Sequence, residues 1–305
     1  MYKVLFVGLS PGLQKTIICN NFTVNEVSRS TKSIFDVSGK CINAARVYAQ
    51  LGGTSICLTQ IGGRDSNIFM QLAEESGITI CPIYTNVDIR YCYTIIDKIK
   101  HTTTELVVNE PGKVNQKIES DFIKKFIEIV PEYHAVVING SKLPGFSKAI
   151  IPNMVTIAKK YNKLVFADYR SSDLVNSLIS QIIRPDFIKI NKEEFEETFG
   201  TTFNNIDIKQ QLISMSSKYN NTFIITQGSK QTLISRSGHF ETHSPAKVTP
   251  VNTTGCGDSF LAGLVMGILS TNSLTKALEM GNDCAMKNAL NIRPGCINQI
   301  QKEIS

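Results

Sequence analysis

The segment 252–258, with the sequence Asn-Thr-Thr-Gly-Cys-Gly-Asp, combines residue types that suit phosphoryl transfer. Its glycines allow backbone N–H groups to converge on one point, and the apolar helix predicted after them adds unpaired N–H groups and the positive end of its dipole. We therefore expect an anion to bind at this turn. Asp258 would lie beside the anion, ionised at neutral pH and placed to accept the proton of an attacking hydroxyl. An aspartate in the first turn of a helix can also be a simple cap, but the Gly-x-Gly-Asp pattern after two threonines favours catalysis.

A second glycine-led turn, at Gly39 and Lys40, opens another predicted helix. Lys40 and Asn43 would lie at its exposed end, where an anionic or polyhydroxyl ligand could bind. In isolation this pattern is weak, because lysine and asparagine in the first turn of a helix are usually ordinary solvated residues.

Two further strand ends carry polar residues that allow two interpretations each. Asn191 and Glu194 follow the apolar run 187–190. They could hold a hydrated Mg²⁺, which keeps several waters and takes one or two carboxylates, or they could simply cap the next helix. Thr226 and Gly228 could present hydroxyl and backbone donors to a nucleotide, or they could form a plain turn.

Composition excludes several classes of protein. The chain has 305 residues, 42% of them hydrophobic, which is enough for one large α/β unit spanning residues 1–305. No apolar run reaches the roughly 18 residues of a membrane span. The chain begins with the strand-like residues 4–7 rather than a leader, so we expect a soluble, cytoplasmic protein. The net charge of +6 is dispersed, which argues against nucleic acid or membranes as partners.

The eight cysteines and four histidines show no metal-ligand spacing, and the Gly-x-x-x-x-Gly-Lys-Ser/Thr loop is absent. We therefore expect free thiols, and neither metal-dependent hydrolysis nor P-loop chemistry.

Short apolar runs alternate with helical patterns along the chain. This order predicts a mainly parallel sheet with helices on both faces. Because ligands of such sheets bind at the carboxyl ends of the strands, the polar residues that follow the apolar runs should meet at one site. The expected strands are 3–8, 55–61, 135–139, 164–168, 187–190 and 222–226, and the expected helices include 42–51, 118–129, 150–160 and 209–218.

The helix predicted after Asp258 carries Gly263 and Gly267 on one side. Small residues at this spacing predict close packing against a neighbouring element.

Two segments, about 16–36 and 88–109, break the alternation with β-rich patterns around polar turns. They are predicted to form hairpins outside the main sheet. Such a β-layer over the strand ends could act as a lid that excludes water. A solvent-facing hairpin or a dimer contact would give the same pattern.

Taken together and in their order along the chain, the motifs resemble those of the PfkB (ribokinase-like) carbohydrate kinases. Within this family they resemble the branch of 1-phosphofructokinase and tagatose-6-phosphate kinase. The resemblance extends from Val4 to about Asn298 and is most specific at 252–263. It is supported by the segments 38–46, 139–141, 189–194 and 226–228.

The resemblance implies a Rossmann-like sheet with a β-lid, ATP and Mg²⁺ as cofactors, and transfer of the γ-phosphoryl group to a sugar hydroxyl. By matching position, Asp258 is the base, and the backbone of Gly255, Cys256 and Gly257 forms the anion hole. The other implied contacts are Gln14, Gly39, Lys40, Asn43, Arg90 and Ser141 with the sugar, Lys189, Asn191, Thr226, Gly228 and Asn288 with ATP, and Asn191 and Glu194 with magnesium through water.

An arginine at the lid is common in this branch, and its guanidinium suits a substrate phosphate, which is the role implied for Arg90. Arg29 is a second, weaker candidate for the same role.

Three positions depart from the family pattern. Gln14 stands where a carboxylate is expected to bind sugar hydroxyls, and an amide can both donate and accept there. Cys41 replaces the second glycine of Gly-Lys-Gly and is expected to add bulk near the ligand. Residues 168–171, Asp-Tyr-Arg-Ser, differ from Asp-x-Ser-Gly. The identity of the sugar is therefore the open part of the prediction.

The sequence predicts an ATP-dependent kinase of a phosphorylated ketohexose, such as fructose 1-phosphate, fructose 6-phosphate or tagatose 6-phosphate. Two alternatives remain: a kinase of an unphosphorylated sugar or a nucleoside, and a nucleotide- or sugar-binding regulatory protein without catalysis. The β-layer would also allow two copies to pair as a homodimer.

Overall fold

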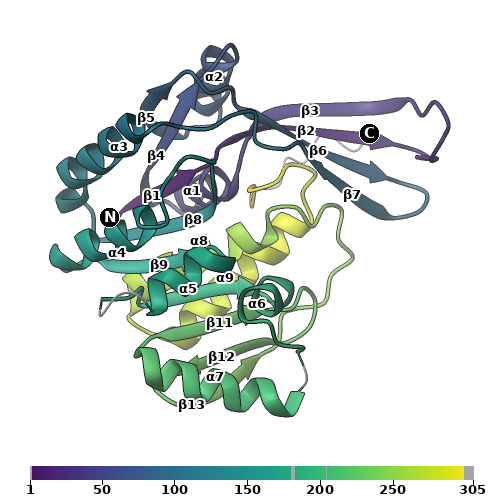
Figure 1. Ribbon diagram of the computed structural model, residues 1–305. Helices are drawn as coiled ribbons and strands as arrows, with labels where there is room; N and C mark the ends of the chain where they lie inside the picture. Colours follow the sequence, from purple (N-terminus) through teal and green to yellow (C-terminus); the bar gives the residue numbers. More distant parts are fainter. Residues whose placement is uncertain (1, 180–182, 204, 299–305) are drawn as a thin grey trace.

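A large central sheet and a smaller sheet that projects from it dominate the molecule (Figure 1). The computed structural model describes residues 2–179, 183–203 and 205–298. Within these residues the large sheet is formed by β1 (Lys3–Leu9), β4 (Thr54–Gly62), β5 (Thr79–Thr85), β8 (Ala135–Lys142), β9 (Leu164–Asp168), β10 (Phe187–Asn191), β11 (Thr222–Thr226), β12 (Thr232–Arg236) and β13 (His239–His243). Their order is β13-β12-β11-β10-β9-β8-β1-β4-β5. All neighbours pair in parallel except the β11–β12 and β12–β13 pairs, which confirms a mainly parallel sheet.

The central strands are buried on both faces, as their continuous apolar sequences require. In β1, Val4 and Phe6 belong to one core, whereas Leu5 and Val7 belong to the other. Side chains alternate between the two faces of a strand, so the same short run supplies both cores.

Helices cover both faces. The helices are α1 (Lys40–Gln50), α2 (Ser66–Glu75), α3 (Gln116–Ile129), α4 (Ile150–Lys160), α5 (Ser171–Ile179), α6 (Lys192–Phe199), α7 (Asn205–Tyr219), α8 (Cys256–Thr271) and α9 (Leu274–Ala289), with a 3₁₀ turn at Val130–Glu132. Helices α3 to α7 contribute to the core on one face, and α1, α2, α8 and α9 contribute to the core on the other. None of the described helices combines the length and apolar character that a membrane crossing would need.

The close packing predicted from Gly263 and Gly267 is confirmed. A Cβ atom on Gly263 would lie 2.5 Å from the carbonyl oxygen of Met280, and one on Gly267 would lie 2.4 Å from Cα of Ala277. Both neighbours are backbone atoms of α9. The two glycines therefore allow α8 and α9 to approach more closely than any larger residue would permit.

The smaller sheet consists of β2 (Gly12–Cys19), β3 (Ser30–Ser38), β6 (Arg90–Asp97) and β7 (Thr102–Val107), in the order β3-β2-β6-β7. The β2–β3 and β6–β7 pairs are antiparallel hairpins, and the parallel β2–β6 pair joins them. The prediction of hairpins outside the main sheet is confirmed, although β2 starts four residues earlier than expected. We call this sheet the lid.

Candidate active site

The carboxyl ends of the parallel strands, the first turns of α1 and α8 and the inner face of the lid enclose a cavity of about 880 Å³. Its lining includes most of the residues that the sequence singled out. These are Gln14, Gly39, Lys40, Asn43, Arg90, Ser141, Lys189, Asn191, Glu194, Gly255, Gly257 and Asp258. Residues from distant parts of the chain thus meet at one place, as the rule for parallel sheets predicts.

The turn before α8 is shaped by Asn252 and Gly255. The Asn252 side chain accepts a hydrogen bond from Thr254 N at 3.0 Å and donates to the carbonyl oxygen of Ile292 at 2.7 Å. Gly255 has φ 80°, a left-handed conformation that glycine adopts without strain. The turn therefore leads directly into the N-terminus of α8, where unpaired N–H groups and the helix dipole favour an anion.

Asp258 lies in the first turn of α8 and is only 7% exposed. Its Oδ2 accepts a hydrogen bond of 2.8 Å from Nδ2 of Asn43, which lies in α1. The two glycine-led helices therefore meet through this hydrogen bond, which fixes the carboxylate at the wall of the cavity.

The protonation state of Asp258 differs from the expectation of a fully ionised carboxylate. Burial, together with the negative charge of Asp168, raises the pKa of Asp258 to about 7. Lys40, the Asn43 hydrogen bond and Lys189 oppose this rise. At neutral pH the carboxyl group is therefore near its midpoint of titration, which is the range in which a general base is most effective.

Asp168 is the centre of a buried charge cluster at the end of β9. Its Oδ1 lies 2.7 Å from Nζ of Lys40, and its Oδ2 lies 3.1 Å from Nζ of Lys189. Lys40 also pairs with Oε1 of Glu194 at 2.7 Å. Burial opposes the charge of Asp168, but the two ammonium groups outweigh it and lower its pKa. Burial likewise opposes the charge of Lys40, and its two carboxylates reverse the effect and raise its pKa. The cluster thus keeps two cations close enough to Asp258 to lower its pKa.

Asn191 and Glu194 form a capping box at the start of α6. Asn191 Oδ1 accepts from Glu194 N at 2.7 Å, and Glu194 Oε2 accepts from Asn191 N at 2.9 Å. Both residues also line the cavity. The capping interpretation is therefore confirmed, and a contact to a hydrated metal remains compatible with it.

A chain of polar side chains links the lid to the turn before α8. Gln14 Nε2 donates to Thr94 Oγ1 at 2.8 Å, and Thr94 Oγ1 lies 3.4 Å from Thr254 Oγ1. Thr254 Oγ1 in turn donates to Oε1 of Glu105, on β7, at 2.6 Å. The lid therefore rests against the predicted anion hole.

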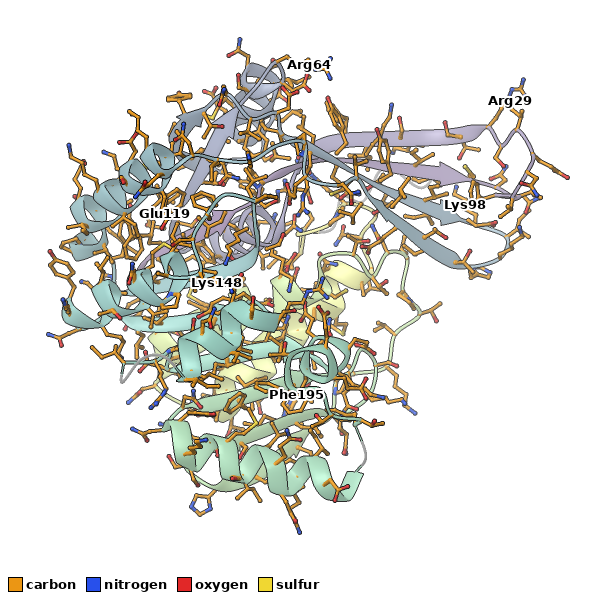
Figure 2. The ribbon with its side chains drawn as sticks, viewed as in Figure 1. Arg29, Arg64, Lys98, Glu119, Lys148 and Phe195 are labelled. Atoms are coloured by element: carbon orange, nitrogen blue, oxygen red, sulfur yellow. The ribbon has the colours of Figure 1, made fainter. Side chains whose placement is uncertain are left out.

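Arg90, the first residue of β6, is largely buried at the base of the lid and pairs with Glu110, the distance from Nη1 to Oε1 being 3.0 Å. Arg29 lies elsewhere: it is exposed at the far tip of the β2–β3 hairpin (Figure 2). Of the two arginines proposed for a substrate phosphate, only Arg90 lines the cavity.

The expectation that Cys41 adds bulk beside the ligand is wrong. Cys41 is buried in the core, where a Cβ on Gly8 would lie 2.5 Å from its own Cβ. Glycine at position 8 provides the space that Cys41 occupies. The substitution therefore packs away from the cavity rather than into it.

Asn288 was expected to contact the nucleotide, but its side chain is fully buried. Its Nδ2 donates to the carbonyl oxygen of Thr254 at 2.9 Å, and its Oδ1 accepts from Gly295 N at 2.6 Å and from Ser259 Oγ at 3.1 Å. All of its polar atoms are used within the protein. Asn288 therefore positions the turn before α8 instead of offering atoms to a ligand.

The thiol of Cys256 also receives a hydrogen bond from Asn288, at 3.3 Å. Burial raises the pKa of this thiol to about 11, so it is neutral at physiological pH. The thiol therefore carries no charge, and the backbone N–H of Cys256 donates to the carbonyl oxygen of Thr253 at 3.2 Å.

Thr226 and Gly228 lie outside the lining of the cavity. Thr226 pairs with Asn191 across the β10–β11 ladder, and Gly228 follows it in an exposed turn with φ 59°. Thr226 therefore lies beside Asn191 at the carboxyl end of β11, and Gly228 follows in the next turn.

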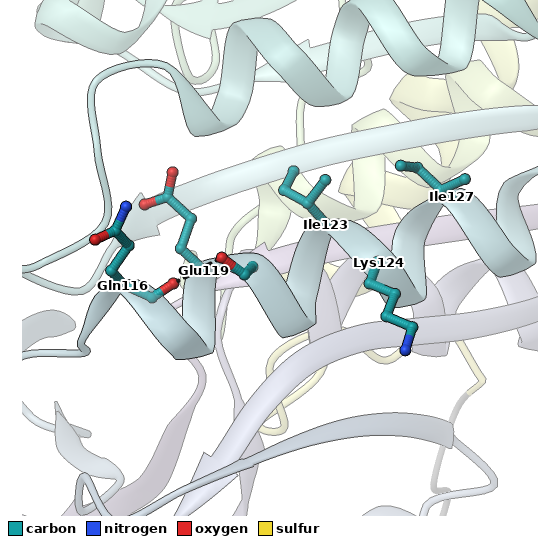
Figure 3. A pocket seen from close by; sticks show the side chains of 6 residues that line it. Gln116, Glu119, Ile123, Lys124 and Ile127 are labelled. Carbon is teal, nitrogen blue, oxygen red and sulfur yellow. Dashed lines mark hydrogen bonds between the residues drawn. The ribbon is translucent and has the colours of Figure 1, made fainter.

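A separate hollow of about 420 Å³ lies on the outer surface of α3 (Figure 3). It is lined by residues of that helix alone, including Ile123 and Ile127. Its carboxylate, Glu119, already accepts hydrogen bonds from the backbone and side chain of Ser147. Charged groups do not converge there, so the cavity under the lid remains the candidate active site.

Solved structures of carbohydrate kinases share this fold. Phosphofructokinase-2 from Escherichia coli in complex with fructose 6-phosphate aligns with a TM-score of 0.84 at 18% identity, over 95% of this chain and 94% of that one. A protein from Thermotoga maritima named as a possible 1-phosphofructokinase aligns with a TM-score of 0.87 at 20% identity, over 96% and 93% of the two chains. The architecture is thus that of the ribokinase-like kinases.

Residues 13–301 match the pfkB family carbohydrate kinases, and the chain belongs to this family. It is similar to a tagatose-6-phosphate kinase of Staphylococcus epidermidis, with 24% identity over 97% of this chain and 94% of the relative. It is also similar to a 1-phosphofructokinase of Vibrio cholerae, with 25% identity over 87% and 82% of the two chains. The predicted family is therefore confirmed, and the protein is a kinase.

Some residues of the site were not assigned a role from sequence. Asp168 carried a signal, since it follows a buried strand at the active edge of the sheet. Glu105 and Glu110 carried none, because ordinary acidic residues in a β-rich segment do not indicate which side chain they will meet.

Proposed function

We propose that this protein transfers the γ-phosphoryl group of ATP to a hydroxyl of a sugar phosphate of the fructose 1-phosphate, fructose 6-phosphate or tagatose 6-phosphate class. Asp258 acts as the base, and the backbone N–H groups of Gly255, Cys256 and Gly257 form the anion hole. The single observation that carries the proposal is the position of Asp258, buried at an anion-binding helix N-terminus and hydrogen-bonded to Asn43.

The residues present fit the two cofactors. A Cβ on Gly257 would lie 2.7 Å from Nζ of Lys189. Because glycine has no Cβ, the space beside the Lys189 ammonium group stays open, and a phosphate could bind there. Within the described residues, His, Cys, Asp and Glu side chains do not form any group of three that could hold a metal ion directly. Asn191 and Glu194 would hold Mg²⁺ through water, which suits a cation that keeps most of its own hydration. Bound together, ATP and Mg²⁺ would supply an activated phosphoryl group with part of its charge neutralised.

Each step of the transfer has a residue to perform it. Asp258 takes the proton of the attacking hydroxyl, and Asn43 holds the carboxylate in place. Lys189 and the N-terminus of α8 stabilise the negative charge of the transferring group. The lid, through the contact between Glu105 and Thr254, excludes water that would otherwise compete as an acceptor. We propose that Thr226 and Gly228 contact the nucleotide part of ATP.

Arg90 supports a phosphorylated acceptor. Its guanidinium lines the cavity and is held at one nitrogen by Glu110, so other N–H groups remain for a substrate phosphate. Gln14, Gly39, Lys40, Asn43 and Ser141 would contact the sugar.

An ADP-release assay over sugar phosphates, the corresponding free sugars and nucleosides tests the proposal. We expect turnover with at least one ketohexose phosphate. If none of the compounds is turned over, the proposed kinase activity is rejected. Arg90→Ala should raise KM for the sugar phosphate by about 10- to 150-fold, which corresponds to roughly 1.5–3 kcal/mol for a lost charged hydrogen bond. An unchanged KM would show that Arg90 does not bind the substrate phosphate.

We also propose that two copies of the chain pair through the lid as a homodimer. The support is apolar surface on the projecting hairpins, where Val27 is 83% exposed and Leu106 is 58% exposed.

A further inference from the structure

Arg90 borders a second and much smaller cavity, of about 10 Å³, in addition to the substrate cavity. Apolar side chains, among them Val87, Ile89 and Leu143, form part of its wall. Its polar lining is Gln60, Glu110 and Asp88, and Oδ1 of Asp88 already accepts a hydrogen bond from Arg64 N. A space of this size holds about one water molecule.

Two buried polar atoms belong to residues that line this small cavity, and neither has a hydrogen-bond partner within the described protein. One is Nε of Arg90, which can only donate, and the other is Oε1 of Gln60, which can only accept. Gln60 is 3% exposed, and its Nε2 already donates to the carbonyl oxygen of Leu9 at 2.7 Å. That hydrogen bond fixes the orientation of the Gln60 amide, so the atom without a partner is the oxygen.

We propose that a single buried water bridges Arg90 Nε to Gln60 Oε1, and that Gln60 is a positioning residue for Arg90. A water accepts from the guanidinium and donates to the amide oxygen, so one molecule satisfies both atoms. Leaving either unpaired would be costly, because a buried polar group without a partner loses its hydration without compensation. One donor, one acceptor and a space of matching size form a complete site.

The guanidinium is then held at two points. Glu110 pairs with Nη1 at 3.0 Å and is itself held by a hydrogen bond from Ser10. The water holds Nε. With Nη1 and Nε both held, the plane of the guanidinium is fixed. Its remaining N–H groups then face the substrate cavity in one side-chain rotamer before the substrate binds. This consequence depends on the proposed function, in which Arg90 binds the substrate phosphate.

The water itself can be tested without any substrate. A crystal structure of the free wild-type protein, at a resolution that shows ordered water, should contain one molecule within about 3.2 Å of both Arg90 Nε and Gln60 Oε1. In solution, the Nε–H proton of Arg90 should exchange slowly with solvent in an NMR spectrum. An empty cavity, or a direct contact between the two side chains, would reject the water even if the protein proves to be an active kinase.

The positioning role is tested by kinetics with two variants at one position. Gln60→Leu removes the acceptor, and we expect KM for the accepted sugar phosphate to rise about 2- to 10-fold, with kcat and KM for ATP changed less than twofold. Gln60→Glu also loses the hydrogen bond to Leu9 but keeps an acceptor for the water, so its KM should stay near the wild-type value. An equal rise in both variants would assign the effect to the Leu9 hydrogen bond and reject the role.

Thr59→Val is the matched control. Thr59 precedes Gln60 on β4 and is also fully buried, and its hydroxyl has no hydrogen-bond partner in the part of the chain that the structure describes, but it does not line the small cavity. Its replacement should leave KM unchanged. A similar rise in KM for Thr59→Val would show that any change in this strand disturbs the site, and would reject a specific role for Gln60.

Discussion

The burial of Asp258, which is costly for the fold, makes its carboxylate a stronger base. A carboxylate in water, with a pKa near 4, is too weak a base to take a proton readily from a hydroxyl. Burial and Asp168 move the pKa of Asp258 to about 7. Lys40 and Lys189 limit the shift, so that a useful fraction remains ionised at neutral pH.

The first prediction concerns Asp258→Asn. Asparagine keeps the shape and can still accept the Asn43 hydrogen bond, but it cannot take a proton. We expect kcat to fall by about 10²- to 10⁴-fold, with little change in nucleotide affinity. Steady-state kinetics and calorimetry with ATP measure the two quantities. A variant with near-normal kcat would show that Asp258 only caps the helix.

The second prediction concerns the pH dependence of the reaction. The base must be deprotonated, so kcat/KM should rise with pH and level off above an apparent pKa of about 7. Asp168→Asn removes a negative charge that raises this pKa and leaves Lys40 and Lys189 free to lower it further. The midpoint of the profile should therefore move to lower pH. A midpoint that stays in place or moves upward would contradict the electrostatic assignment.

The third prediction concerns stability. The pKa of Asp258 is about 7 in the folded protein, above the ordinary value of 3.8. The folded state therefore prefers the protonated form, and the fold loses stability as pH rises from about 4 to about 7, after which the loss is constant. Asp258→Asn does not titrate. Its melting temperature should exceed that of the wild type by an amount that grows between pH 5 and pH 7 and then levels off, as calorimetry can measure. A difference that shrinks over this range would contradict the raised pKa.

The glycines of helix α8 face different neighbours at the two ends of the helix. Gly257 faces the flexible end of Lys189, whereas Gly267 faces the backbone of α9. A flexible ammonium group can move, but a packed backbone cannot move without cost.

The fourth prediction is therefore a contrast within α8. Gly267→Ala should lower the free energy of unfolding by about 1–3 kcal/mol, because its Cβ would overlap Ala277, while kcat of the folded protein stays near normal. Gly257→Ala should change stability less but lower kcat, because its Cβ would displace Lys189 and crowd the N–H groups of the anion hole. Denaturant titration and kinetics of both variants test this. Equal losses of stability in both would contradict the contrast.

Most elements could be predicted because their patterns are strong. The central strands are short continuous apolar runs, as expected of strands buried on both faces of a parallel sheet. Strand β5 was missed because it contains Pro82, which a strand tolerates at the edge of a sheet, where β5 lies. The β12–β13 hairpin was missed because its outer strand, His239–His243, is polar. The Ser237-Gly238 turn, with positive φ at both residues, was the signal that could have found it.

At the scale of the whole molecule, the sequence predicted which strand ends meet but not which side chains pair. The parallel order brings residues 39–43, 191–194 and 252–258 to one edge, and this follows from topology. The direction of a single side chain does not. Cys41 turns into the core because Gly8 leaves space, and Asn288 turns inward because the turn before α8 needs its hydrogen bonds. Such details depend on packing between segments far apart in the chain.

Within the described residues, the outer strands of the lid, β3 and β7, each pair with a neighbouring strand on one side only. Apolar residues such as Val27 and Leu106 are exposed on its projecting hairpins. An edge strand of this kind pairs readily with another strand unless something blocks it. A second copy of the lid offers a matching surface, which is the basis of the proposed dimer.

The fifth prediction is that the protein is a dimer at micromolar concentration and that Leu106→Lys weakens it. A charge on the edge strand β7 would have to be buried in the interface, so the dissociation constant should rise at least about tenfold. Ile127→Lys is the matched control, because Ile127 is also an exposed apolar residue, at 42%, but lies on α3 (Figure 3). Light scattering over a concentration series measures both. A monomeric wild type, or equal dissociation constants for the two variants, would place the association elsewhere or exclude it, while the lid could still close over the substrate within a single chain.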